Sequence, residues 1–382
     1  MIKFSQRQRK CFLIKISILC LIFILFTNVI KIDKALAYTS SKAEVVLEVE
    51  SGRMLFAKNE NEKLPMASTT KIITAITAIE NSDISADVKI SGQTCNIEGS
   101  SVYLKEGDIF TLKDLLYGLM LRSGNDCAET IALFVGKTRD NFIKMMNEKC
   151  TSIGCENTCL TNPHGLPDEN HYTSALDLAK ISAYSMKNEV FKEIVSTKKV
   201  VVTEKSKGEN RVFVNKNKML LNFEGANGIK TGYTKKAGRC LVSSAKRNGM
   251  QLVCVVINSP QMFERSSELL NNSFSEYEYK CVFDSKKLEK DCSLFDFTLI
   301  SSKKSFYYPL SKTEKVKIKY ETFNNFDFPI RKDKEICKVD IFSQNKLIFS
   351  EKIYTINSIK NKKTLDCIKE KIKSYFSENY EN

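Results

Sequence analysis

A serine and a lysine three residues apart stand directly before a run of apolar residues near the start of the chain. Ser68 and Lys71 lie in the stretch 65–71, and residues 72–79 after them are apolar nearly all round. Such a run predicts a buried helix, and residues at i and i+3 of a helix share one face, a turn apart. The fold is therefore expected to enclose a hydroxyl and an amine together where water is excluded. This is one way to build a serine nucleophile without histidine.

The Ser-x-x-Lys spacing carries little weight alone, because it occurs five times in a chain with 59 lysines and arginines. The other four pairs begin at Ser196, Ser243, Ser301 and Ser343, and none of them opens an apolar helix. Only the pair at Ser68 combines this spacing with a predicted buried helix.

Two short triplets follow the pair in the chain. Ser123-Gly-Asn125 separates two predicted helices, and Lys230-Thr-Gly232 precedes two predicted strands. Each triplet has an ordinary interpretation alone, the first as a polar turn and helix cap, the second as the end of a strand. Their order behind Ser68 and their structural contexts favour one catalytic site assembled from all three motifs.

The remaining pattern predicts a mixed fold. Short apolar runs at 43–50 and 54–57 flank a glycine turn and predict a β-hairpin, and strands at 239–245 and 250–258 are joined by Asn248-Gly249, a strong hairpin signal. Helical patterns fall at 112–121, 126–135, 139–149, 174–186 and 266–270, and a further strand at 198–203. Strands from both ends of this region are therefore expected to form one sheet, with a mostly helical block inserted between them.

The three motifs together are the signature of penicillin-recognising serine enzymes. In the forms found at 68–71, 123–126 and 228–234, they closely resemble those of the D-alanyl-D-alanine carboxypeptidases among the low-molecular-mass penicillin-binding proteins. Segments 162–167 and 237–242 are also similar to that family, and 328–340 more loosely resembles the β-rich domain that many members carry. The resemblance implies an α+β fold: a transpeptidase/β-lactamase-like antiparallel sheet flanked by helices, with a helical insert and a small C-terminal β-rich domain.

The resemblance also implies a reaction. Ser68 would attack the carbonyl between two D-alanines of a peptidoglycan stem peptide, giving an acyl-enzyme and free D-alanine. Lys71 would act as base and Ser123 would relay the proton to the leaving nitrogen. The backbone N–H groups of Ser68 and, by resemblance, Tyr233 would form the oxyanion hole. β-Lactams would acylate Ser68 and leave slowly, and no cofactor or metal is needed.

Four residues are expected to bind the substrate. Asn125 would offer its amide to the substrate backbone, Lys230 and Thr231 would hold the terminal carboxylate, and Gly232 would let the substrate strand approach closely. A family arginine near that carboxylate aligns with Met262, with Arg265 nearby. Either Arg265 substitutes for it or Lys230 and Thr231 suffice.

Lysine chemistry sets a strict condition on this site. A free lysine has a pKa of about 10.4, so Lys71 would be charged near neutral pH. To act as a base there, its pKa must fall by roughly three units, or about 4 kcal/mol of environment. Burial supplies such a shift by desolvation, and a second cation such as Lys230 acts in the same direction.

Three alternatives stay open. A serine β-lactamase would share the motifs, and Asp168 or Glu169 would then have to activate the deacylating water. A non-catalytic wall-binding protein is a second alternative, against which the intact motifs argue. An endopeptidase that cuts cross-links is close kin and is not separated from a carboxypeptidase by sequence. The two histidines, His164 and His171, are interpreted as loop and cap residues, and zinc chemistry lacks a ligand set.

The chain is expected to be exported. Residues 1–37 combine a basic start, an apolar run and the sequence Ala35-Leu-Ala37, which together predict a signal peptide cut after Ala37, with an uncut anchor as the lesser interpretation. A catalytic domain follows at 38–278, a β-rich domain at 279–362, whose strands are expected at 315–320, 336–342 and 347–354, and an amphipathic helix at 363–382. That helix would dock on its own domain or lie on a membrane surface.

Charge and cysteine content constrain the protein less. The net charge is +14, and residues 1–37 carry +6 of it, which leaves +8 on the mature chain. This charge fits attraction to anionic wall polymers or lipid headgroups, or a lysine-rich bias of the whole proteome, and no nucleic-acid binding is predicted. Of thirteen cysteines, most are interpreted as small buried residues, including Cys127 beside the second motif. If a disulfide forms, Cys150, Cys155 and Cys159 are the favoured participants.

Overall fold

The computed structural model describes residues 41–293 and 300–380, so the predicted signal peptide lies outside the described residues. The chain divides into two compact units, which are described separately. The first is built mainly from Met54–Ala245 and Val253–Leu270 together with the described residues up to Leu47, and the second mainly from Asn271–Asn382.

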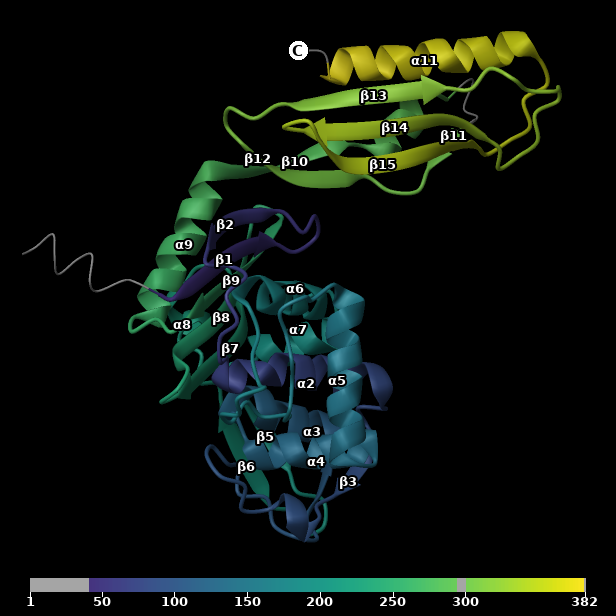
Figure 1. The fold of residues 1–382 in the computed structure, drawn as a ribbon. Coiled ribbons are helices and arrows are strands. Elements are labelled where there is room, and N and C mark those ends of the chain that lie inside the picture. The colour runs from purple at the N-terminus through teal and green to yellow at the C-terminus, as the bar shows by residue number, and fades with distance from the viewer. Residues whose placement is uncertain (1–40, 294–299, 381–382) are drawn as a thin grey trace, which may run out of the picture. The chain divides into compact units, whose positions relative to one another are not determined.

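The first unit contains a five-stranded sheet in the order β2-β1-β9-β8-β7 (Figure 1). Its strands are β1 (Ala43–Glu48), β2 (Met54–Lys58), β7 (Ala226–Thr234), β8 (Gly238–Arg247) and β9 (Met250–Ile257). The neighbouring strands β1 and β9 are buried along their whole length, as expected for strands covered on both faces. Asn248 and Gly249 both have positive φ, which suits the tight turn between β8 and β9. Strands from both ends of the region thus form one sheet, as predicted.

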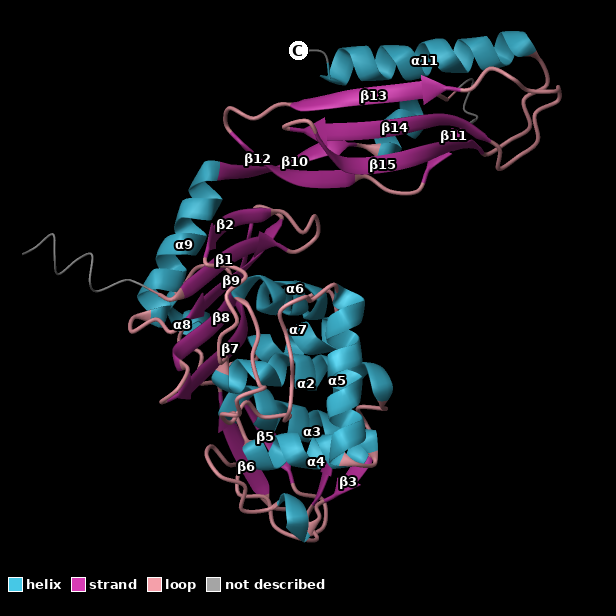
Figure 2. Ribbon diagram, in the orientation of Figure 1, coloured by secondary structure: helices cyan, strands magenta, loops and turns pink. Residues whose placement is uncertain are grey.

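Between β2 and β7 lies the predicted helical block (Figure 2). Its helices are α2 (Lys71–Asn81), α3 (Leu112–Tyr117), α4 (Asn125–Gly136), α5 (Arg139–Ile153), α6 (Ala175–Ser185), α7 (Glu189–Ser196) and α8 (Met219–Asn222). Helix α2 packs against α4, α5, α6 and α7, so its apolar residues lie inside the block. Side chains of Thr111, Thr138, Ser174 and Asn188 cap α3, α5, α6 and α7, which explains where these helices begin.

Short strands complete the block. They are β3 (Asp87–Lys89) paired with β4 (Ile109–Thr111), and the hairpin of β5 (Lys199–Thr203) and β6 (Asn210–Val214). Strand β6 and helix α7 were not predicted from the sequence. Helix α9 (Met262–Glu276) is longer than the predicted helix at 266–270.

After α9, the described part of the second unit contains two small sheets and two helices. Strands β10 (Tyr277–Phe283) and β12 (Phe306–Ser311) form one antiparallel pair. The other sheet has the order β11-β15-β14-β13, from β11 (Ile300–Ser302), β13 (Val316–Thr322), β14 (Glu335–Ser343) and β15 (Lys346–Thr355). The helices are the short α10 (Ser285–Asp291), not predicted, and α11 (Lys362–Tyr380).

The apolar face of α11 is part of the core of this unit. Leu365, Ile368, Ile372 and Phe376 are at most 3% exposed and belong to the same buried cluster as Ile336 and the residues around it in β14. The helix therefore docks on its own domain, which is the first of the two arrangements that the sequence left open. Within residues 41–293 and 300–380, no helix is both long and apolar enough to cross a membrane.

Removing a core contact of α11 tests this docking. Because Ile368 is fully buried, Ile368→Ala is expected to lower the free energy of unfolding by about 2–5 kcal/mol. The exposed Lys373 on the same helix provides the control, and Lys373→Ala is expected to change it by less than about 0.5 kcal/mol. Denaturant unfolding followed by circular dichroism measures both, and equal small effects would contradict the docking.

Candidate active site

Ser68 lies on a 3-10 turn, η1 (Ala67–Thr70), that leads into α2, and Lys71 is the first residue of that helix. The turn is fixed by its own threonines, since Thr69 Oγ1 donates to Met66 O at 2.6 Å and Thr70 Oγ1 donates to Ala67 O at 2.9 Å. Ser68 therefore lies in the 3-10 turn that precedes the α-helix, and not in the α-helix itself.

The loop 161–171 packs closely against this turn. Ala67 has φ of 49°, in the left-handed region that bulky residues rarely adopt. A Cβ on Gly165 would lie 1.9 Å from Ala67 O, so only glycine fits there. His171 holds the same turn, because its Nε2 lies 2.9 Å from Thr70 Oγ1 while its Nδ1 accepts from the N–H of Thr161. His171 therefore acts on the turn through the hydroxyl of Thr70.

Lys71 has three polar partners although it is fully buried. Its Nζ lies 3.1 Å from Ser68 Oγ, 2.6 Å from Asn125 Oδ1 and 2.7 Å from the carbonyl oxygen of His164. The structure thus brings the nucleophile, the predicted base and a residue of the second motif together. The His164 carbonyl was missed by the sequence reasoning, because a backbone acceptor leaves no residue-type signal.

A neutral amine can satisfy all three of these partners, as a charged one can. A neutral amine has two N–H donors and one lone pair. The Asn125 and His164 oxygens can only accept, so they take the two N–H groups, and the lone pair is left facing Ser68 Oγ, whose hydroxyl can donate. In this neutral form of Lys71, the proton that Ser68 must lose points at the atom that would receive it.

Electrostatics act in the same direction. Burial lowers the pKa of Lys71 well below its usual value, and the charge of Lys230 lowers it further, while Asp126 acts against both. Burial also lowers the pKa of Lys230, to about 7, with Lys216 as the second cause. The condition that the sequence analysis placed on Lys71 is thus supported by the direction of its pKa shift.

The residues predicted to bind the substrate carboxylate come from β7, the edge strand of the sheet. Lys230 is 2% exposed and its Nζ donates to the carbonyl oxygen of Thr231 at 2.9 Å. A Cβ on Gly232 would lie 3.1 Å from the backbone nitrogen of Ser68 and 3.2 Å from Met66 O. The close approach that Gly232 permits is therefore between β7 and η1. The motif lies inside a strand, not at a strand end.

The second motif starts at the end of a π-helical turn, η3 (Gly118–Arg122). Ser123 is 5% exposed and left-handed, with φ of 67°, and Asn125 is the first residue of α4. No hydrogen bond between Ser123 and Lys71 is found among the described residues. Asn125 Nδ2 donates to Glu98 O at 2.5 Å, so one N–H of its amide is left for a substrate.

The residues whose role the sequence analysis left undecided make no hydrogen bond to Ser68 or Lys71 within the described residues. Arg265 makes a two-point ion pair with the fully buried Glu44, both distances being 2.8 Å, which ties α9 to β1. Asp168 and Glu169 are exposed, and within the described residues no hydrogen bond joins either to Ser68 or Lys71. Cys127 is 1% exposed and packs beneath the second motif, in line with a packing role.

The cysteines and the possible metal ligands show no cross-link or metal site within the described residues. The eleven cysteines of the described residues are free thiols, including Cys150, Cys155 and Cys159. Within the same residues, no group of three or more histidine, cysteine, aspartate or glutamate side chains is arranged to hold a metal ion.

Fold and site together define a class of protein. A buried lysine facing a serine hydroxyl, beside an edge strand that carries Lys230 and Gly232, is an acyl-transfer site of the serine–lysine type. The D-alanyl-D-alanine carboxypeptidase family matches residues 31–261. The chain belongs to this family, and the predicted family and fold class are confirmed.

Individual relatives agree with this assignment. The D-alanyl-D-alanine carboxypeptidase DacF of Bacillus subtilis is 34% identical over 246 residues, which cover 62% of this chain and 63% of DacF. The chain thus spans a little under two thirds of that relative. Penicillin-binding protein 5 of Haemophilus influenzae superposes with a TM-score of 0.69 at 26% identity, covering 85% of this chain and 98% of that one. The Streptomyces K15 DD-transpeptidase superposes with a TM-score of 0.59 at 30% identity over 62% of this chain and 97% of its own.

The pKa of Lys230 predicts a pH dependence. Since that pKa is about 7 and only the cation attracts a carboxylate, kcat/KM for a D-alanyl-D-alanine peptide is expected to fall as the pH rises above about 7. Lys216→Ala removes a charge that lowers this pKa, so the alkaline limb is expected to move to higher pH. Lys332→Ala in the second unit provides the control, and pH profiles that coincide for all three proteins would contradict the assignment.

Proposed function

We propose that this protein is a serine D-alanyl-D-alanine carboxypeptidase that removes the terminal D-alanine from peptidoglycan stem pentapeptides. The observation that carries the proposal is the arrangement around Lys71 Nζ, where two obligate acceptors orient the amine toward Ser68 Oγ. The family assignment supports the same activity over a β-lactamase or a non-catalytic wall protein.

The reaction has two steps. Ser68 Oγ attacks the carbonyl carbon of the penultimate D-alanine while its proton passes to Lys71 Nζ, and the backbone N–H groups of Ser68 and Tyr233 stabilise the oxyanion. Ser123 passes the proton to the leaving nitrogen, the C–N bond breaks and D-alanine departs. Water then attacks the ester with Lys71 as base, which releases the shortened peptide and restores Ser68.

Substrate binding is assigned to the two flanking motifs. Lys230 as a cation and the hydroxyl of Thr231 hold the terminal carboxylate, and the remaining N–H of Asn125 Nδ2 binds the substrate backbone. Gly232 contributes by letting β7 come close to Ser68, so that the strand edge and the nucleophile border the same bond.

The location of the protein follows from its substrate. We propose that the signal peptide at 1–37 directs export and that the enzyme acts outside the cytoplasm on peptidoglycan, with β-lactams as inhibitors that acylate Ser68. The apolar face of α11 is used within its own domain, so any contact of this helix with a membrane surface would involve its exposed lysines, such as Lys362 and Lys373.

Peptide turnover tests this function. Wild type is expected to release D-alanine from a pentapeptide ending in D-alanyl-D-alanine, and Ser68→Ala is expected to lower kcat at least about a thousandfold. Lys71→Met, which keeps much of the side-chain volume, is expected to cause a similar loss because no base remains. Intact-protein mass spectrometry with benzylpenicillin should show one adduct on wild type and none on Ser68→Ala.

The same assay separates the alternatives. Release of no D-alanine by wild type would refute the carboxypeptidase. Rapid multiple turnover of benzylpenicillin would favour the β-lactamase instead.

A further inference from the structure

Tyr103 is exposed and held in an unusual conformation. Its side chain is 80% exposed, more than any other large hydrophobic residue among the described residues. Its φ of 61° lies in the left-handed region, which a bulky residue adopts only when its surroundings impose it. Two costs therefore coincide at one residue, an aromatic ring left in water and a strained backbone.

The carboxylate of Asp126 imposes this conformation from one side. Asp126 is fully buried, and its Oδ2 accepts the N–H of Val102 at 3.1 Å, the N–H of Leu104 at 3.1 Å and the hydroxyl of Ser101 at 2.6 Å. Both neighbours of Tyr103 are thus tied to one carboxylate, and the N–H of Tyr103 itself donates to Ser101 Oγ at 2.8 Å. The residue between the two anchored amides is turned outward.

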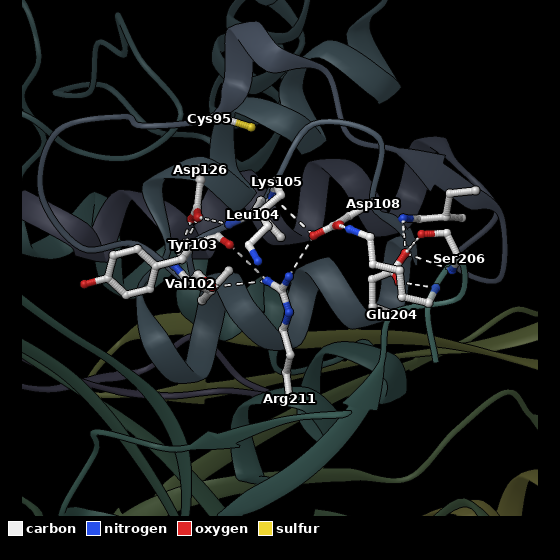
Figure 3. A network of polar contacts seen from close by, with 12 residues as sticks. Cys95, Val102, Tyr103, Leu104, Lys105, Asp108, Asp126, Glu204, Ser206 and Arg211 are labelled. Carbon is white, nitrogen blue, oxygen red and sulfur yellow. Dashed lines mark hydrogen bonds and ion pairs between the residues drawn. The ribbon is translucent and has the colours of Figure 1, made fainter. Parts of the chain in front are cut away.

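Arg211 from β6 fixes the other side (Figure 3). Its Nη1 donates to the carbonyl oxygens of Val102 at 3.3 Å and Tyr103 at 3.2 Å, and its Nη2 pairs with Asp108 at 2.7 Å. Asp108 is 1% exposed, so this ion pair is buried at its acidic end. In Figure 3 the ring of Tyr103 points away from this network, whose bonds involve its backbone only. The network fixes the backbone that carries the ring, and none of its hydrogen bonds uses the ring itself.

The same segment forms one wall of the active site. Asn125, which accepts from Lys71 Nζ, donates through Nδ2 to Glu98 O and through its backbone N–H to Ser100 O at 2.7 Å. A Cβ on Gly124 would lie 3.2 Å from Val102 Cγ1, so the segment also packs on the second motif. Tyr103 therefore follows directly on residues that contact the catalytic asparagine.

We propose that Tyr103 is a specificity-determining residue whose ring contacts the side chain of the diamino acid that precedes the two D-alanines of a stem peptide. This inference rests on the proposed function. Lys230 and Thr231 hold the carboxylate end, so the rest of the peptide extends from Ser68 past Asn125, toward the segment that presents Tyr103. When that diamino acid is lysine, its side chain is a long aliphatic chain that ends in an ammonium group.

The chemistry of the ring suits that side chain. A tyrosine face packs on methylene groups and attracts a cation through its quadrupole, and its side chain has only two χ angles to order on binding while its backbone is already fixed. A strained position that exposes the ring is explained by such a use, whereas folding of the segment alone requires only the backbone contacts to Asp126 and Arg211.

Two peptides that differ at one side chain test the proposal. For acetyl-L-lysyl-D-alanyl-D-alanine, Tyr103→Ala is expected to lower kcat/KM about tenfold, mainly through KM, and for acetyl-glycyl-D-alanyl-D-alanine less than about twofold. Tyr103→Phe is expected to keep the wild-type preference for lysine over glycine. Tyr103→Gly should lose the preference while its Tm equals or exceeds that of wild type, because glycine accepts this φ.

The remaining outcomes of this experiment also decide whether Tyr103 has the proposed role. An equal loss on both peptides, or an unchanged ratio between them, would overturn the role of Tyr103. Leu347→Ala, at a 49% exposed site in the second unit, is the control and should leave the ratio unchanged. If wild type hydrolyses neither peptide, the proposed function fails. The role of Tyr103 is then tested by binding. The Kd of the lysine peptide is measured for the Ser68→Ala variant and for the double variant Ser68→Ala/Tyr103→Ala. A tenfold higher Kd for the double variant supports the contact, and equal Kd values refute it.

Discussion

The contact of Lys71 with Ser68 is the interaction on which the rest of the first unit depends. A lysine that is fully buried loses the hydration that favours its charged form, and the nearby charge of Lys230 opposes protonation further. Burial alone would yield a neutral amine of undefined orientation. The oxygens of Asn125 and His164 define it, because each takes one N–H and together they direct the lone pair at the nucleophile.

Much of the surrounding structure follows from this need to seal and orient one amine. Helix α2 has to be apolar on nearly every side because α4, α5, α6 and α7 surround it. The loop that supplies the His164 carbonyl has to approach η1 closely, which only Gly165 allows. The strand that carries Lys230 has to approach from the other side, which Gly232 allows. Glycines and a buried helix thus serve the same purpose as the catalytic residues.

The sequence predicted those parts of the site that depend on residue type and spacing. The apolar run behind Lys71, the hairpin signal at Asn248 and the order of the three motifs were sufficient for the sheet, the helical block and the residues that meet. Partners that are backbone atoms, such as the His164 carbonyl, could not be predicted from the sequence. The place of the third motif inside β7 was also not predicted, because its lysine and glycine have little strand propensity and the segment is held by pairing with β8.

Long-range partners decided the remaining cases. The amphipathic pattern of α11 has one apolar face whether it meets a membrane or a sheet, and only the tertiary structure places that face in the core of the second unit. Arg265 could not be assigned because its partner, Glu44, is 221 residues away along the chain. The same limit applies to Tyr103, whose exposure depends on Asp126 and on Arg211, a residue 108 positions later.

Backbone strain follows a common logic at two places in the first unit. Ala67, directly before the nucleophile, and Tyr103, on the wall beside Asn125, both have left-handed backbones without being glycine. In each case the strain is held by neighbouring polar contacts, from Thr70 and the Gly165 loop in one case and from Asp126 in the other. Alanine has a small side chain, so the cost under Ser68 is modest and is explained by the position of the hydroxyl. A tyrosine costs more in that conformation, and its ring makes no contribution to the buried network, so the function of the ring has to be sought in what it meets outside the protein.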